Sequence, residues 1–380
     1  MRAAFIHDHV FPVYDNTYYC TPGFDNSFMN RYVDIFGHIR IIARHKVGVC
    51  KKESIENKNV SFYTIASTKQ LLKSKFRKEL EQEMQDVDYA VIRVPSVFGI
   101  IASSICRKKN IPYLVEVVGY AKDALLTRGK KWKIPAYIFD VLTKNVVAKA
   151  KYVVYVTDMF LQEKYPCYGR SISCSNVALE GYYDFDIETK SFDIMRKNDD
   201  IIKLGTCAMI GQRYKGQDMV IHALKLLEDE NEKFEYQLVG GGNNEWLKCL
   251  ACELEVDDKV KFLGEKKQNE IFDWMDDIDI YIQPSRTEGL CRTIIEAMSR
   301  GCPIISSDVG GAFEQIDSEY IFHVEDIEQL ANMIKKFDKQ KRTEQSKRNY
   351  HEAEKYCSQI LYERRKEFFN RFINENKRGV

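Results

Sequence analysis

Short apolar runs recur along the chain and alternate with longer segments whose apolar residues follow a helical period. In the first half these runs occupy 3–6, 39–43, 89–94, 112–118 and 152–156. Most are nearly continuous and rich in Val, Ile and Tyr, which is typical of strands buried on both faces of a parallel sheet. The segments 68–85 and 97–109 between them are long enough to be crossover helices.

The second half repeats the pattern, with strands predicted at 203–210, 236–240, 260–264, 278–284 and 302–307 and helices at 219–230 and 244–254. This is the order of an α/β protein with two parallel sheets. The stretch 191–200 is polar, lacks a core pattern and lies in the predicted join. We expect an N-terminal domain over 1–185 and a C-terminal domain over 186–354. A last helix is predicted over about 352–375. We expect the C-terminal residues from about 355 to 380 to pack back on the first domain.

Charge is distributed unevenly between the two halves. The net charge of +1 over 380 residues combines 27 Lys and Arg with 17 Asp and Glu in 1–180, and 30 with 39 in the remainder. A basic N-terminal half fits an anionic phospholipid surface or a pyrophosphate-bearing acceptor. It fits equally well a complementary face toward an acidic second domain, and both interpretations stay open.

Several classes of protein are not favoured. The first residues lack a secretory signal and no apolar stretch approaches about 18 residues, so a cytoplasmic protein is expected. The 11 cysteines are scattered and odd in number, and in a protein without a secretory signal this indicates reduced thiols rather than disulfides. Cys249 and Cys252 lack the second pair that a zinc site needs, so no metal is predicted. The glycines of 239–244 do not fit the dinucleotide pattern, so a nicotinamide cofactor is not expected. A nucleic-acid partner is not expected either.

The segment 278–303 carries the candidate chemistry. A strand is followed by the polar loop SRTEGL, a helical segment CRTIIEAMSR, and a stop at Gly301 and Pro303. Glu288 therefore lies on a loop at the carboxyl end of a strand, and Glu296 about two turns along the next helix. Ligands bind at such strand ends in open α/β sheets, and these carboxylates suit sugar and ribose hydroxyls. A pair of glutamates without a role is the alternative.

Backbone groups at the same place suit an anion. The amides of Leu290, Cys291, Arg292 and Thr293 would be free donors at a helix N-terminus. Gly289 would let the backbone approach a ligand closely.

A second loop at a strand end is basic. The predicted strand 203–210 runs into GQRYKGQD, which places Arg213 and Lys215 beside Gly211 and Gly216. Cations and glycines at such a position suit a diphosphate. A single basic loop is weak evidence for a ligand site, because solvated basic loops are also common. Two such loops at the carboxyl ends of strands favour a ligand site more strongly.

The sequence PSRTEGLCRTIIEAMSRGCPIISSDVGG resembles the signature of the family 4 glycosyltransferases. That signature has two glutamates separated by seven residues, then Ala-Met and Gly-x-Pro, which match Glu288, Glu296, Ala297–Met298 and Gly301–Pro303. The diphosphate-loop Lys-Gly matches Lys215–Gly216. The resemblance is dense over roughly 200–340 and looser over the first domain. It implies the GT-B fold, in which two Rossmann-like domains with parallel sheets face each other across a cleft.

The resemblance also implies roles. Glu288 would hold the donor sugar as the key catalytic carboxylate, and Glu296 would bind the ribose. Arg213 and Lys215 would neutralise the leaving diphosphate, and Gly23 would approach the diphosphate or the acceptor from the first domain. Members transfer with retention and usually without a metal. A nucleotide-sugar donor follows, and a UDP-sugar is the commoner case.

The sequence departs from the family in two places. Leu290, Cys291 and Arg292 stand where many members have Phe-Gly-Asn, and no histidine follows the predicted strand 112–118. His7 and His9 follow the first strand and could contact an acceptor, although a structural or exposed role is the alternative.

The resemblance to polysaccharide-assembly members implies a glycan acceptor, and a glycan linked to a polyprenyl diphosphate at the inner face of the membrane is one acceptor of this kind. The basic segment 130–151, with Trp132, Tyr137, Ile138 and Phe139 interleaved, could lie on an anionic membrane or pack on the sheet. The other functions considered are a sugar-nucleotide epimerase of the same fold and a non-catalytic GT-B scaffold.

Overall fold

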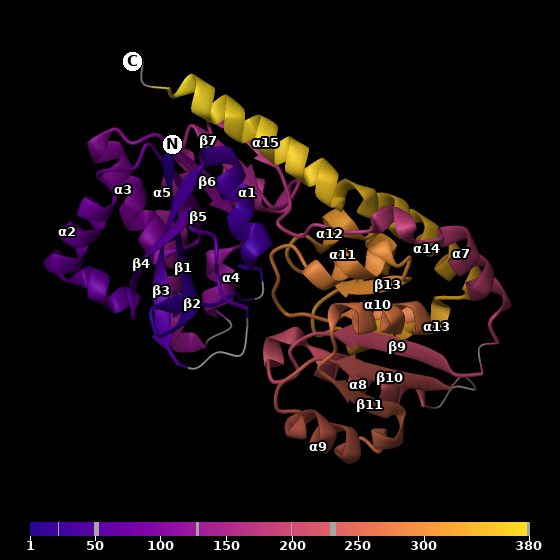
Figure 1. The fold of residues 1–380 in the computed structure, drawn as a ribbon. Helices are drawn as coiled ribbons and strands as arrows, with labels where there is room; N and C mark the ends of the chain where they lie inside the picture. The colour runs from indigo at the N-terminus through magenta and orange to yellow at the C-terminus, as the bar shows by residue number, and fades with distance from the viewer. Residues whose placement is uncertain (22, 49–52, 127–128, 199, 229–232, 378–380) are drawn as a thin grey trace. The chain divides into compact units, whose positions relative to one another are not determined.

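The computed structural model describes residues 1–21, 23–48, 53–126, 129–198, 200–228 and 233–377. The chain forms two compact units, Met1–Cys174 with Tyr362–Val380, and Ser175–Leu361, which we call unit 1 and unit 2. Each unit has its own sheet flanked by helices (Figure 1). The chain crosses between the units at 174/175 and 361/362, whereas the sequence placed these boundaries at 185/186 and 354/355.

The sheet of unit 1 has the strand order β4-β3-β1-β5-β6-β7-β8, with β2 antiparallel to β1 and every other pair parallel. Its strands are β1 (Arg2–Tyr14), β2 (Thr17–Tyr18), β3 (His38–Val47), β4 (Val60–Ile65), β5 (Tyr89–Val94), β6 (Tyr113–Val117), β7 (Tyr152–Tyr155) and β8 (Arg170–Ser173). The order reverses between β1 and β5, as in doubly wound α/β folds. The prediction did not include β2, β4 or β8, and β1 is longer than predicted.

The helices of unit 1 begin and end where local residues satisfy the backbone. They are α1 (Asn26–Phe36), α2 (Ser74–Glu83), α3 (Val97–Lys109), α4 (Ala121–Leu126), α5 (Lys133–Ala148), α6 (Phe160–Lys164) and most of α15 (Ser358–Glu375). The predicted helix 68–85 is a short 3-10 turn, Thr68–Leu72, followed by α2. Ser96 caps α3 by accepting from the amide of Gly99, and Asn110 ends it in the left-handed conformation.

A carboxylate accepts hydrogen bonds from the first amides of α3 at the reversal point of this sheet. The oxygens of Asp8 accept hydrogen bonds from the amides of Val97 (2.6 Å) and Phe98 (2.9 Å). Burial raises the pKa of Asp8 against the opposing effect of these amides and of Arg44. The first turn of this helix is thus satisfied within the protein.

A buried ion pair lies beneath α1 in unit 1. The guanidinium of Arg93 contacts the carboxylate of Glu116 at 3.1 Å, and their side chains are 6% and 2% exposed. The hydroxyl of Tyr32 donates to the same carboxylate (2.7 Å). The C-terminal helix α15 completes this core, with Phe369 packed beside Tyr32.

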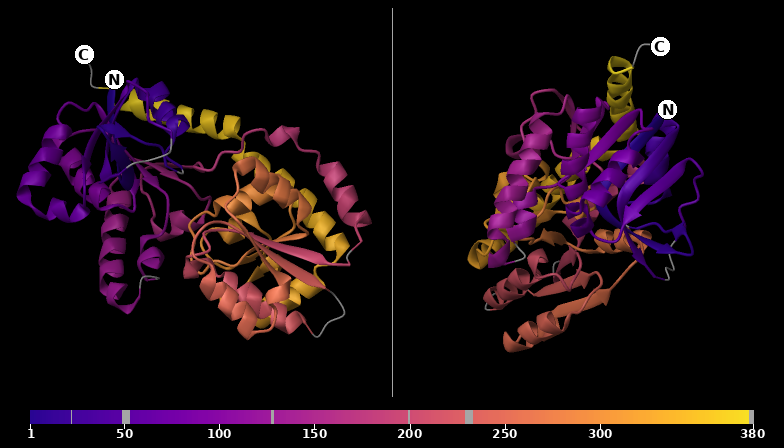
Figure 2. Two further views of the ribbon diagram at one scale, coloured as in Figure 1. Left: turned by 60° about the horizontal axis from the view of Figure 1, so that its bottom comes forward. Right: turned by 90° about the vertical axis from the view of Figure 1, so that its left-hand side faces the viewer.

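The sheet of unit 2 has the order β11-β10-β9-β12-β13-β14, and all its strands are parallel. Its strands are β9 (Ile202–Cys207), β10 (Phe234–Val239), β11 (Val260–Gly264), β12 (Ile280–Gln283), β13 (Ile304–Ser307) and β14 (Ile321–Phe322). Its helices are α7 (Ile187–Arg196), α8 (Gln217–Leu227), α9 (Glu245–Glu253), α10 (Gln268–Asp277), α11 (Arg292–Ser299), α12 (Ala312–Gln315), α13 (Ile327–Lys336) and α14 (Lys339–Ala353). Figure 2 shows helices on both faces of this sheet.

Three predictions near the ends of helices need correction. The polar stretch 191–200 is largely helical, because α7 continues to Arg196 with Asp186 as its cap. The predicted last helix, 352–375, begins later than expected, because α14 ends at Ala353 and α15 runs from Ser358 to Glu375. The predicted helix 219–230 ends at Leu227, and its last two residues lie outside the described residues.

Candidate active site

Two loops meet at the point where the strand order of unit 2 reverses. β9 and β12 are neighbours, and the chain leaves β9 toward β10 and β12 toward β13. The loop after β9 leads to α8 through a 3-10 turn, Arg213–Lys215, and the loop after β12 leads to α11. Crevices at such reversal points bind ligands in open α/β sheets.

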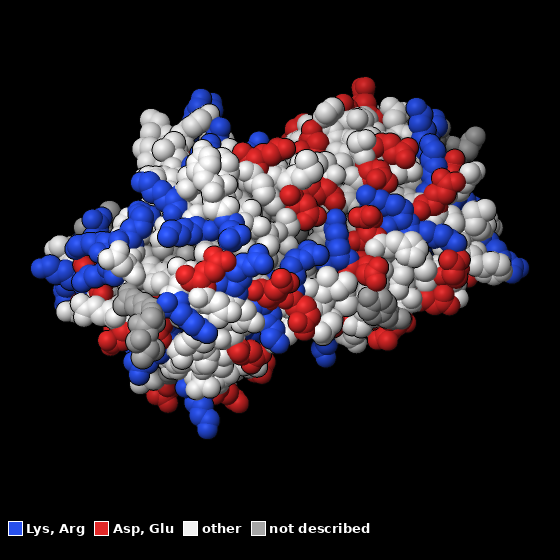
Figure 3. Space-filling model, turned by 90° about the horizontal axis from the view of Figure 1, so that it is seen from above, with Lys and Arg blue, Asp and Glu red and all other residues white. Residues whose placement is uncertain are grey.

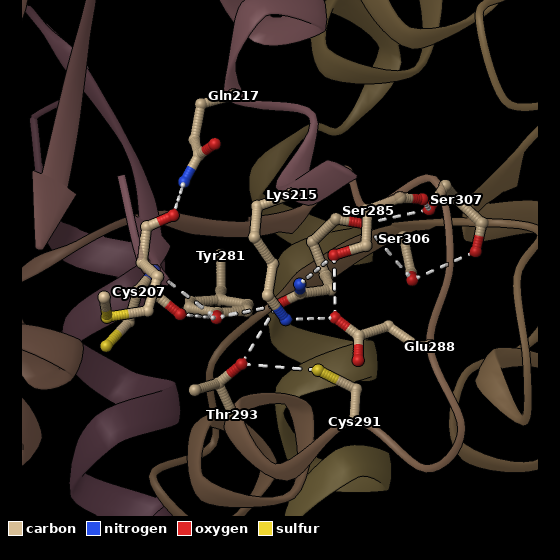
Figure 4. A network of polar contacts seen from close by, with 12 residues as sticks. Cys207, Lys215, Gln217, Tyr281, Ser285, Glu288, Cys291, Thr293, Ser306 and Ser307 are labelled. Carbon is tan, nitrogen blue, oxygen red and sulfur yellow. Dashed lines mark hydrogen bonds and ion pairs between the residues drawn. The ribbon is translucent and has the colours of Figure 1, made fainter. Parts of the chain in front are cut away.

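Each loop contributes one charged side chain to an ion pair. The ammonium of Lys215 lies 2.5 Å from Oε1 of Glu288, and the two side chains are 18% and 16% exposed. Ser285 also donates to this oxygen (2.8 Å), and Gln283 donates to Ser285 (2.8 Å) (Figure 4). Burial lowers the pKa of Lys215, but the charge and hydrogen bond of Glu288, together with Cys291 and Tyr214, raise it, and the pKa is raised overall. The sequence therefore identified two residues that the fold brings together.

Gly216 makes the close approach of these loops sterically feasible. Its φ is +71°, and a Cβ there would lie 1.8 Å from the carbonyl oxygen of Pro284, at the end of β12. A side chain at this position would push the Lys215 loop away from the Glu288 loop. A second glycine, Gly310, has φ +57° and a Cβ position only 2.4 Å from the carbonyl oxygen of Glu288.

Glu296 lies on α11 and is 8% exposed. Gln268 (3.1 Å) and Arg292 (3.2 Å) both donate to its Oε1. Burial raises the pKa of Glu296, and Arg292 opposes this rise. Because Gln268 and Arg292 both use Oε1, the other carboxylate oxygen is the one suited to a ligand hydroxyl.

Two buried thiols lie among these groups. Cys207 at the end of β9 interacts electrostatically with Glu296, Cys291 and Lys215, and burial raises its pKa to about 12. Burial likewise raises the pKa of Cys291 to about 12. Both thiols are therefore protonated and poor nucleophiles at neutral pH.

The remaining predicted residues of the loop before α11 are tied to the unit. The carbonyl of Gly289 accepts from the amide of Gly311 (2.8 Å), and Leu290 packs against the core. Cys291 precedes the first turn, and Thr293 donates to Gln283 (3.0 Å).

Arg213 lies in the same 3-10 turn as Lys215 but has a different partner. Its guanidinium lies 5.0 Å from the ring centre of Trp246, whereas Lys215 faces Glu288. A cation over an indole ring is a stable arrangement. The sequence grouped the two cations in one loop, and the fold gives each its own partner.

Gly23 lies between β2 and α1, whereas His7 and His9, which the sequence placed after the first strand, lie within β1 because that strand runs to Tyr14. Gly23 has φ +76°, and no atom lies within 4 Å of the position its Cβ would take. The ring of His9 stacks on Phe24 at 3.9 Å and shares a 2.6 Å hydrogen bond with Thr21. Burial, with Arg93 and Arg44, lowers the pKa of His9 to about 4. His9 is neutral at pH 7, and it packs from β1 against the segment that holds Gly23.

Sequence reasoning did not identify Arg286, although it lies two residues before Glu288. It donates to Asp218 and Glu325, which are 68 and 39 residues away. No local pattern connects such distant partners. Only its place inside the strand-end loop could have indicated a role.

Two further observations concern metal binding and membrane spans. No group of three or more His, Cys, Asp or Glu side chains in the described part of the chain is arranged to hold a metal ion. Within the same residues, no helix combines the length and the apolar character needed to cross a bilayer.

Comparison with known proteins identifies the family. Residues 194–355 match the model of the glycosyl transferases group 1. Protein CapJ of Staphylococcus aureus is 35% identical over 99% of this chain and 97% of its own length. The chain belongs to the glycosyl transferases group 1. It is therefore a glycosyltransferase.

Two other proteins extend the comparison. The N,N'-diacetylbacillosaminyl-diphospho-undecaprenol alpha-1,3-N-acetylgalactosaminyltransferase of Campylobacter jejuni is 25% identical over 59% of this chain and 59% of its own length. Among solved structures, Anabaena Alr3699/HepE in complex with UDP has a TM-score of 0.69 at 15% identity, covering 98% of this chain and 100% of that one. This likeness shows the GT-B fold of glycosyltransferases.

Proposed function

We propose that this glycosyltransferase moves a sugar from a UDP-sugar to a polyprenyl-diphosphate-linked glycan, with retention at the anomeric carbon, in cell-surface polysaccharide biosynthesis. The observation that supports it most is the ion pair between Lys215 and Glu288 at the reversal point of the unit 2 sheet. A cation and a carboxylate held side by side suit the two ends of a sugar diphosphate. Neither requires a metal ion for this role.

Each group has a physical task in the proposal. Lys215 exchanges part of its contact with Glu288 for the diphosphate and stabilises the charge of the leaving group. Glu288 then accepts hydrogen bonds from sugar hydroxyls. Glu296 accepts from the ribose, and the amides at the start of α11 approach the phosphates. Arg213 adds positive potential from its place over Trp246.

Donor and acceptor are proposed from the named relatives. Anabaena HepE is described in complex with UDP, which favours a uridine donor. The Campylobacter relative is named for a diphospho-undecaprenol-linked acceptor, which favours a lipid diphosphate here. Gly23 in unit 1, with open space at its Cβ position, is the proposed point of backbone approach to that acceptor or to the diphosphate.

The test begins with ligand-induced stabilisation of the whole chain. UDP-, GDP-, ADP- and dTDP-sugars are compared by thermal shift, since a ligand that binds only the folded state raises the melting temperature. Transfer to a lipid-diphosphate glycan follows, with the anomeric configuration of the product read by NMR. Glu288→Ala should lower kcat by about 10²-fold or more, because a transition-state contact is removed. Stabilisation by none of the four donors would refute the proposal.

The same assays address the two alternatives. An epimerase would convert the nucleotide sugar without an acceptor, and a scaffold would keep its effect in cells after Glu288→Ala. The Lys215–Glu288 contact supports neither in preference to transfer.

We further propose that α5 places unit 1 on an anionic membrane. One side of this helix exposes Ile134 (73%), Val141 (62%), Ile138 (56%), Tyr137 (48%) and Leu142 (40%). These positions follow a helical period, and a contiguous apolar stripe of this kind marks an interaction surface.

The positive charge near α5 favours an anionic membrane as the partner of this apolar stripe. Lys130, Lys131 and Lys133 are exposed at the start of the helix. Unit 1 as a whole has 33 Lys and Arg against 19 Asp and Glu. Figure 3 shows basic side chains gathered toward the left of that view. An apolar stripe flanked by lysines is the pattern of helices that lie in a lipid interface.

Vesicle flotation tests the membrane proposal. We expect the protein to float with phosphatidylglycerol vesicles at low salt. With vesicles of phosphatidylcholine alone, we expect it to stay in the bottom fraction of the gradient. Ile138→Asp should abolish flotation, whereas Phe192→Asp, a similarly exposed apolar residue on α7 (57%), should not. Equal flotation of both variants would rule out α5 as the membrane contact.

A further inference from the structure

Arg286 uses its whole guanidinium to hold other loops. Nη1 donates to the carbonyl of Arg213 (2.7 Å) and to Asp218 (2.8 Å). Nη2 donates to Asp218 (2.8 Å) and Glu325 (3.1 Å), and Nε donates to Glu325. A guanidinium has five N–H donors, and these contacts use all five.

The backbone of Arg286 adds a sixth bond. Its amide donates to the carbonyl of Tyr214 (2.7 Å). The contacts therefore lie on both sides of Lys215, at Arg213 and Tyr214 before it and at Asp218 after it. They connect the loop after β12 with the loop after β9 and, through Glu325, with the loop after β14.

We propose that Arg286 is a positioning residue for glycosyl transfer. It fixes the separation of Lys215 and Glu288 by fastening the loop that carries one to the loop that carries the other. Arg286 itself has no task at the reacting atoms. The inference rests on the proposed roles of the ion pair and adds the residue that sets its geometry.

Lysine cannot replace Arg286 in this role. An ammonium group has three donors on a flexible stem and cannot make a bidentate contact with Asp218 while reaching Glu325 and a carbonyl. Since a displacement of about 1 Å between reacting groups lowers a rate by about 10²-fold, partial release of the loop is sufficient to show in kcat.

The chain contains a matched control. Arg300 makes a comparable contact with Asp276 within unit 2, with Nε at 2.9 Å from one carboxylate oxygen and Nη2 bonded to the other. The side chains of Arg286 and Arg300 are 25% and 24% exposed. Arg300 follows the last turn of α11, whereas Glu288 precedes the first. Arg300→Lys therefore breaks a similar two-point contact with a carboxylate without releasing either loop.

The experiment measures kcat and KM for sugar transfer by the full-length variants. We expect R286K to lower kcat by about 10- to 100-fold and R300K to change it less than threefold. R286K should lower the melting temperature more than R300K, because its guanidinium makes more hydrogen bonds. R286K should have little further effect when Lys215→Ala is already present, because its role acts through Lys215. Asp218→Asn replaces R286K should that variant not fold.

The outcomes separate two failures. A wild-type protein that transfers sugar, together with an R286K variant no slower than R300K, overturns the positioning role alone. Full additivity of R286K with K215A does the same. A wild-type protein that transfers nothing from any of the four nucleotide sugars refutes the proposed function instead.

Discussion

Replacing Gly216 by alanine should separate the Lys215 and Glu288 loops. The backbone there has φ +71°, which costs an L-residue about 1–2 kcal/mol. In addition, the new Cβ would lie 1.8 Å from the carbonyl oxygen of Pro284, far inside van der Waals contact. Relief of such a clash through backbone movement adds about 1–3 kcal/mol. The summed loss of unfolding free energy is about 2–5 kcal/mol.

Gly264 provides the control for the backbone term. It has φ +73° in the same unit, but nothing lies within 4 Å of the position of its Cβ. Gly264→Ala should therefore cost only about 1–2 kcal/mol. Melting temperatures of both variants, with and without UDP, give the difference in stability.

Activity gives the second comparison. Movement of the loop by about 1 Å should lower kcat/KM of Gly216→Ala by about 10²-fold, whereas Gly264→Ala should stay close to the wild type. Equal melting temperatures and equal transfer rates in the two variants would refute the reasoning. In that case the approach of Gly216 to Pro284 would not set the geometry of the ion pair.

Two other variants test charges described above. Arg292→Ala removes the group that holds down the pKa of Glu296, so that pKa rises and the carboxylate is lost at a higher pH. In the pH profile of kcat/KM for the donor, the loss of activity at low pH should therefore begin at a higher pH. An unchanged profile would exclude an effect of Arg292 on the titration of Glu296. Glu116→Gln leaves Arg93 buried without its counter-charge and should cost about 3–5 kcal/mol in a thermal melt. Lys75→Ala, which removes a pair whose lysine is 80% exposed, should cost under about 1 kcal/mol, and similar losses for both would contradict the burial argument.

The sequence predicted elements best where burial is complete. β5 and α3 occupy the predicted ranges 89–94 and 97–109, and every residue of β5 is buried. β8, with the sequence RSIS, is only partly buried, and β14 has two residues, so neither produces an apolar run. α7 was missed because Ile187 is its one buried apolar residue, whereas Phe192 and Met195 are exposed.

The site was predictable to the extent that it follows from strand ends. Lys215 and Glu288 stand in loops after β9 and β12, and adjacent parallel strands bring such loops together. The partner of Arg213 was not predictable, since Trp246 belongs to a helix after a different strand. Arg286 was missed for the same reason, because its meaning lies in Asp218 and Glu325.

The two crossings of the chain between units have a consequence for synthesis on the ribosome. Unit 1 is interrupted at Cys174 and completed by residues from Tyr362 onward. Those residues supply Phe368, Phe369 and Phe372, which are at most 6% exposed. At about 5–20 residues per second, the first 174 residues wait roughly 10–40 s for this part of their core. Unit 2 is contiguous, so it can fold first, and the N-terminal sheet must stay unaggregated until the last helix leaves the ribosome.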